Sequence, residues 1–204
     1  TKAIRLQNNG KLNNSEREPK RLRSSEPDLE VVLGSGEDEV KKWYHSPTLA
    51  SKSKYIDAML SAPMRESEAR KITFPDITPE IWEKMMKFLD SPIAVRRMNE
   101  GDVSDVAVLY DKYEFDEGTK LCDLLLFDYF KSVKSMEGTL SLDVNLVVDS
   151  LVVAKEANLE LALKIGVRYV WTKMHSEVTP YGRTMFTENH MKKLGAGFFA
   201  CICP

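Results

Sequence analysis

The segment from Lys71 to Leu89 constrains the fold more than any other part of the chain. "KITF" (Lys71 to Phe74) has the composition of a short strand, and Pro75-Asp76 ends it. Thr78-Pro79 then opens the most regular helical pattern in the sequence. In that helix the apolar residues recur at helical spacing: Ile81, Trp82, Met85, Met86, Phe88 and Leu89. Together with the two strands and two short helices predicted before it and the helical pair after it, this unit predicts an α+β fold, in which helices cluster on a small mixed sheet.

Two more strands are predicted on the N-terminal side of this unit. Leu29, Val31 and Leu33 alternate along "DLEVVLG", and Gly34-Ser35-Gly36 is a turn signal before "VKKWYH". These segments therefore predict a hairpin. Ser46-Pro47 predicts the start of a short helix, since the first helical amide needs no partner, and a second short helix is predicted over Tyr55 to Leu60.

The C-terminal half is predicted to be helical. Asp102 is expected to cap a helix whose apolar stripe includes Val106 and Tyr110, and Leu121 to Phe130 is apolar almost all round, which predicts a buried helix. About 46 residues later the same rhythm returns, with Leu-Glu-Leu at residues 159–161 matching Tyr-Glu-Phe at residues 113–115. This indicates a loose internal repeat of a helical hairpin. Thr187 and Gly195 are expected to delimit a last short helix.

Composition limits the class of protein. With 204 residues, 43% hydrophobic and 29% charged, the chain can build a real core and is not disordered as a whole. A net charge of -2 gives no field that would attract nucleic acid or anionic lipid. No apolar run approaches the roughly 20 residues of a membrane span, so no membrane partner is expected. Three cysteines, Cys122, Cys201 and Cys203, suit neither a disulfide framework nor a zinc site, which favours a reducing compartment, cytoplasmic or nuclear.

The first 27 residues differ in kind from the rest. Thr1 to Pro27 carries seven Lys and Arg against three Glu and shows no apolar period, so it is expected to be a disordered basic tail. Within it, "PKRLR" (Pro19 to Arg23) has the composition of a nuclear-import patch, although short basic clusters are also common in solvated tails. The tail has charge but no element that reads bases, so no specific nucleic-acid binding is expected.

Chemical motifs are sparse. His45, His175 and His190 lie far apart and in no metal-ligand spacing, and no nucleophile elbow or phosphate-binding loop follows a strand. The sequence therefore predicts no catalytic residues, no metal, no cofactor and no enzymatic activity, with His45 as a structural residue at a strand end. Trp43, Trp82 and Trp171 lie in apolar periods and are expected in the core.

Six segments occur in this order along the chain: "DLEVVLG", His45, "LASKSKYIDAMLS", Met64-x-Glu66, "ITFPDITPEIWEKMMKFL" and "LYDKYEF". Taken together, they resemble a BTB/POZ domain of the wider BTB, Skp and elongin C superfamily. The resemblance covers residues 28 to 131 and implies a non-enzymatic protein-interaction module, usually a homodimer, which in many members bridges a protein substrate to a cullin scaffold in a ubiquitin ligase. Residues 132–204 are similar to the helical BACK-type extension that follows such domains. An alternative in the same fold is an oligomerisation module of a nuclear or transcriptional regulatory protein without a ligase role.

The resemblance also implies two interaction sites. Met64, Arg65 and Glu66 have the hydrophobic, any, Glu order that cullin-binding members display before the third strand, and they are expected on an exposed link. The dimer interface is expected around the first short helices and their neighbours, with Leu49, Ser53, Tyr55 and Ile56 near the two-fold axis. This chain departs from many members at two places: Ser46-Pro47 stands where a basic residue usually follows the histidine, and Ile56 stands where Phe is common.

Overall fold

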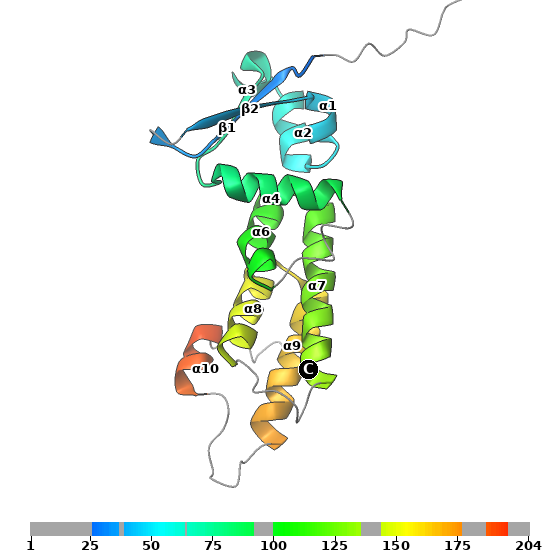
Figure 1. Ribbon diagram of the computed structural model, residues 1–204, viewed down its shortest axis with the longest axis vertical. Coiled ribbons are helices and arrows are strands. Elements are labelled where there is room, and N and C mark those ends of the chain that lie inside the picture. Colours follow the sequence, from blue (N-terminus) through cyan, green and yellow to red (C-terminus); the bar gives the residue numbers. More distant parts are fainter. Residues whose placement is uncertain are drawn as a thin grey trace, which may run out of the picture.

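A small mixed sheet lies at one end of the molecule (Figure 1). The computed structural model describes residues 26–36, 39–63, 65–91, 100–135, 144–176 and 187–195. In these ranges β1 (Leu29–Leu33) is the central strand, with β2 (Val40–Tyr44) antiparallel on one side and β3 (Lys71–Phe74) parallel on the other. All three predicted strands are confirmed. One face of the sheet faces the core through five buried side chains: Leu29, Val31, Leu33, Ile72 and Phe74.

Short helices accompany the sheet, and a longer one crosses beneath it (Figure 1). Trp82, on the longer helix, is fully buried, stacks on Phe74 at 5.1 Å between ring centroids, and donates its indole N–H to the Tyr44 hydroxyl at 2.7 Å. The predicted helix at Thr78-Pro79 is therefore confirmed, along with its burial. The four helices are α1 (Ser46–Ala50), α2 (Lys54–Ser61), α3 (Arg65–Ala69) and α4 (Pro79–Asp90).

The remaining helices run away from α4 in antiparallel pairs, with α10 against α8 (Figure 1). Lys84 of α4 ties the first pair to the sheet end by ion pairs with Asp102 at 2.9 Å and Asp105 at 2.7 Å. In the described ranges, the buried apolar residues other than Val32 form one cluster that continues from β1 to α10. The helices are α6 (Glu100–Lys112), α7 (Asp116–Ser135), α8 (Val144–Glu156), α9 (Glu160–Ser176) and α10 (Glu188–Leu194).

The helical repeat is present, but its predicted register is wrong by two residues. Glu114 and Asn158 are the left-handed residues of the two turns, with φ of 52° and 53°, a spacing of 44 positions (114 to 158). After each of them the next amide reaches back five residues: Phe115 N donates to Tyr110 O and Leu159 N donates to Ala154 O, both at 2.8 Å. This is the hydrogen-bond pattern of a Schellman helix end, and it aligns Phe115 with Leu159, both fully buried.

Several expectations about individual side chains are wrong. Trp43 is 60% exposed and Trp171 is 38% exposed, because each lies on the outward side of its element. Leu124 is 52% exposed on α7, so this helix is not buried all round. Asp102 lies inside α6 rather than capping it, and it pairs with Lys84 instead.

The last helix begins and ends where the sequence predicts. Thr187 precedes α10 and its hydroxyl accepts the His190 N–H at 3.5 Å, while Gly195 follows the helix with φ of 81°, as expected. Cys122 is buried as a free thiol, and burial raises its pKa to about 12. Cys201 and Cys203 lie outside the described residues. Within the described ranges no helix is long and apolar enough to cross a membrane.

Candidate protein-interaction surfaces

The hydroxyl of Ser53 joins the two short helices to the first helical pair. It donates to the carbonyl oxygen of Tyr113 at 2.7 Å and accepts the N–H of Ile56 at 3.1 Å, which caps α2. Ser53 is 1% exposed, so both bonds lie away from water. One residue on, the Lys54 N–H donates to the carbonyl oxygen of Glu114 at 3.2 Å. The link between α1 and α2 is thereby fixed to the turn between α6 and α7.

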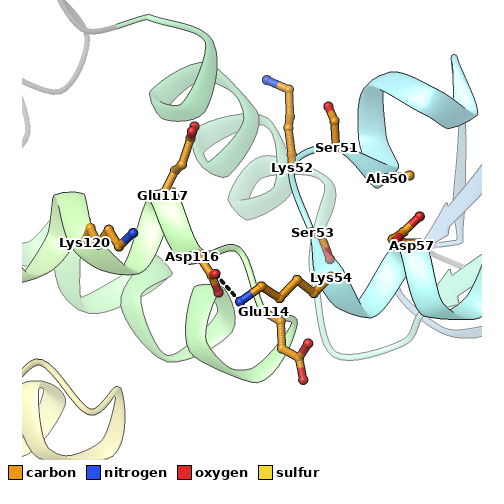
Figure 2. Close-up of a pocket in the computed structure, with 10 residues that line it drawn as sticks. All are labelled: Ala50, Ser51, Lys52, Ser53, Lys54, Asp57, Glu114, Asp116, Glu117 and Lys120. Carbon is orange, nitrogen blue, oxygen red and sulfur yellow. Dashed lines mark ion pairs between the residues drawn. The ribbon is translucent and has the colours of Figure 1, made fainter.

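A groove with a volume of about 300 Å³ lies over this junction. Figure 2 shows the side chains that line it. Across it, Lys54 of α2 pairs with Asp116 of α7 at 2.5 Å, and this hydrogen bond raises the pKa of Lys54. Lys52 pairs with Asp90 at the end of α4. The lining is charged on both sides and suits polar contacts with a protein surface. The lining residues are Ala50, Ser51, Lys52, Ser53, Lys54, Asp57, Glu114, Asp116, Glu117 and Lys120.

The four residues expected at a dimer interface lie beside this groove, but most of them point inward. Leu49 is 2% exposed, Ser53 1% and Ile56 0%, so their side chains fill the core of their own chain. Tyr55 is 36% exposed and rests edge-to-face on the Tyr113 ring at 5.3 Å. Of the four, Tyr55 is the one that presents a large side chain to solvent. Their place near a two-fold axis stays a prediction.

The residues expected to bind a cullin lie between α2 and β3. Met64 is outside the described residues. Arg65 and Glu66 begin α3, so the exposed link expected from the sequence is a short helix over this stretch. None of the residues of α3 is buried. Arg70, with φ of 50°, follows the helix and turns the chain into β3.

A polar cluster at the start of β1 was not foreseen from the sequence. The Asp28 carboxylate accepts the Ser46 N–H and the Ser46 hydroxyl, both at 2.7 Å, and these bonds lower the pKa of Asp28. Arg70 Nη1 lies 3.4 Å from the Ser46 hydroxyl oxygen and 3.9 Å from Asp28. A basic charge is thus placed beside Ser46 by Arg70, the residue that follows α3. Its spacing of 24 residues from Ser46 leaves no local sequence signal.

The structure describes the side chains of His45 and His190. His45 is exposed, follows β2 and precedes α1, as expected for a residue at a strand end. His190 on α10 accepts the Thr187 N–H at Nδ1, 3.0 Å away, and its Nε2 lies 3.0 Å from Asn145 Oδ1. In the part of the chain that the structure describes, no three His, Cys, Asp or Glu side chains come together as metal ligands.

These features define a class of protein: a small mixed sheet with short helices on it, a stack of helical hairpins, and charged or exposed surfaces suited to binding other proteins. The family model for the BTB/POZ domain matches residues 20–127, just over half of the chain. The chain therefore belongs to the BTB/POZ family, whose domains are interaction and oligomerisation modules. A comparison with curated proteins found no match.

Proposed function

We propose that this protein is a homodimeric adaptor that brings a protein substrate to the cullin scaffold of a ubiquitin ligase. The observation that carries the cullin part is α3, a helix between α2 and β3 none of whose residues is buried. Glu66 lies in its first turn, directly after Met64-Arg65 in the sequence. A methionine supplies adaptable apolar contact and a carboxylate supplies charge complementarity, a combination that recognition surfaces use.

Titration calorimetry against a cullin N-terminal fragment tests this role. The double variant Met64→Ala with Glu66→Ala should weaken binding by more than about 2 kcal/mol, the scale of a truncated hot spot. Glu68→Ala is the matched control, because Glu68 is an exposed acidic residue on the same helix. We expect it to bind as the wild type does. A wild-type protein that gives no heat with the fragment would remove the ligase role and leave an oligomerisation module.

The dimer part of the proposal rests on the exposed side of α2 and the groove beside it. Tyr55 provides a large amphipathic side chain there, the type that interfaces favour, and symmetric dimers use the same patch on both protomers. Light scattering of the wild type should give a dimer at tens of micromolar. Tyr55→Asp should shift it toward monomer, whereas Leu124→Asp on the exposed side of α7 should not. A wild-type monomer at this concentration would contradict the dimer.

A further inference from the structure

The outer strand β2 carries the most exposed large apolar side chain among the described residues. Trp43 is 60% exposed and Val40, on the same strand, is 37% exposed. In the described sheet β2 has β1 as its neighbour on one side and no strand on the other. An edge strand offers unpaired backbone groups to another strand, and an exposed tryptophan is a common interface anchor. Both features therefore fall on one short segment.

Lysines on an edge strand usually oppose such pairing, so the charges of Lys41 and Lys42 have to be accounted for. Lys41 lies 3.5 Å from Glu30 of β1, and Lys42 pairs with Glu83 of α4. Each lysine thus has a carboxylate of its own chain beside it. A second strand that approaches β2 meets paired charges rather than two free cations.

We propose that β2 pairs antiparallel with β2 of a second copy, with the two-fold axis at Lys42. In this register Lys41 stands opposite the Trp43 of the other copy, twice, and Val40 stands opposite Tyr44. A lysine beside a tryptophan face is a favourable cation–π pair. Lys42 faces its own equivalent, and the two Glu83 carboxylates accompany that pair. The two sheets become one continuous sheet of six strands.

The self-complementarity of the strand is what selects a second copy as the occupant. A contact across a two-fold axis must be favourable with its own image, and "VKKWY" read against its reverse places lysine on tryptophan twice and valine on tyrosine twice. The central pair, Lys42 on Lys42, is the one like-charge pair, and each of these lysines is paired with Glu83 of its own chain. This surface is separate from the proposed α1–α2 interface and does not depend on it. If both contacts form, each protomer has two different two-fold partners, and the assembly grows beyond a dimer.

Cysteine cross-linking reads this register directly. In a background with Cys201→Ser and Cys203→Ser, and with the buried Cys122 retained, Lys42→Cys places two thiols opposite each other across the axis, within the Cα separation of a disulfide. Lys41→Cys is the matched control, because its own equivalent is displaced by two residues along the strand, beyond disulfide reach. We expect a covalent dimer from Lys42→Cys at least tenfold faster than from Lys41→Cys under mild oxidation. Equal rates, or no dimer from either variant, would overturn the proposal.

Analytical sedimentation of the protein with Cys201→Ser and Cys203→Ser tests whether Trp43 contributes to this self-association. Trp43→Thr keeps a strand-forming residue and should weaken self-association through β2 at least tenfold. Trp171→Thr removes the other exposed tryptophan, on α9, and should leave this association unchanged. Because cross-linking at residue 42 reports only the β2 contact, it succeeds or fails independently of the α1–α2 dimer and of cullin binding. Unchanged association in Trp43→Thr would also overturn the proposal.

Discussion

Ser53 shows how much of this structure depends on one hydroxyl group. Its oxygen accepts the Ile56 N–H and so caps α2, and the hydroxyl donates a hydrogen bond to the carbonyl oxygen of Tyr113, in the turn between α6 and α7. Removal of the hydroxyl would leave a buried carbonyl oxygen and a helix-end N–H without their partner, and each such loss costs free energy.

We therefore expect Ser53→Ala to lower the free energy of unfolding by about 1–2 kcal/mol, measured by urea denaturation. Ser51→Ala is the matched control, since the Ser51 hydroxyl donates to the Thr48 carbonyl oxygen at 2.8 Å but lies at the exposed surface. It should change stability by less than about 0.5 kcal/mol. Equal decreases in the free energy of unfolding of the two variants would show that the buried Ser53 hydrogen bonds stabilise the fold no more than the exposed Ser51 bond does.

The hydrogen bonds of the Asp76 carboxylate should make the stability of the protein depend on pH. Burial alone raises its pKa, but the hydrogen bonds from Lys112, at 2.6 Å, and from the Tyr113 hydroxyl outweigh this and leave the pKa of Asp76 below its ordinary 3.8. A carboxyl whose pKa is lowered by folding stabilises the protein above its unfolded-state pKa. That contribution is lost as the pH falls through the folded-state pKa.

As the pH falls from about 5 to about 2.5, the wild type should therefore lose more stability than the Asp76→Asn variant does. Thermal unfolding at several pH values measures the difference. Asp57→Asn, on the exposed side of α2, serves as a matched substitution that should follow the wild type. Parallel curves for the wild type and Asp76→Asn would contradict the expected linkage.

Among the elements, the contact between α6 and α7 depends on a missing side chain. A Cβ atom at Gly118 would lie 2.5 Å from Tyr110 Cδ1, and the ring cannot swing away easily because its hydroxyl donates to the Met85 carbonyl oxygen at 2.7 Å. We expect Gly118→Ala to destabilise the protein by about 1–3 kcal/mol, the usual cost of overpacking. In a Tyr110→Ala background the same substitution should cost much less, and a double-mutant cycle of denaturation curves measures this coupling. Additive effects would show that the ring is not the obstacle.

Local sequence patterns predicted most of the helices and strands, and long-range contacts account for the errors in register and burial. Thr78-Pro79 and the alternation along β1 are local signals, so their elements were predicted to within a residue or two. The repeat register was misplaced because Leu-Glu-Leu resembles Tyr-Glu-Phe in composition, whereas the turn is fixed by the backbone at Asn158. Trp43 was assigned to the core because its hydrophobicity is visible in the sequence but the face it occupies is not.

The candidate surfaces were predicted less well than the fold. Arg65 and Glu66 were expected on an exposed link: Arg65 is exposed and Glu66 is half-buried. Their helix was not foreseen, since five residues give too short a pattern to recognise. The inward direction of Leu49 and Ile56 depends on contacts with the rest of the chain, which a sequence pattern does not specify. The groove depends on two turns about 60 residues apart in sequence, joined by Ser53 and Tyr113.

The basic N-terminal segment, residues 1–27, is not expected to contribute to the stability of the whole molecule. The anchor of β1 to α1 is the side chain of Asp28, which accepts two hydrogen bonds from Ser46 and follows that segment. Deletion of residues 1–27 should therefore leave the free energy of unfolding within about 0.5 kcal/mol, as for other changes that touch no core. The melting temperature of the truncated chain measures this. A large decrease would mean that the segment contributes a strand or another contact to the fold.

The single buried cluster from β1 to α10 has a consequence for how the molecule unfolds. The family match ends at residue 127, inside α7, while Phe130 of the same helix is fully buried and belongs to that cluster. The sheet and the helical stack therefore share one cooperative unit rather than two that melt independently. Heat should reveal one transition by far-ultraviolet and near-ultraviolet dichroism alike. A destabilising substitution in α8 or α9 would then weaken binding at the surfaces at the far end of the molecule. It would do so without an allosteric pathway, because the folded fraction of both ends falls together.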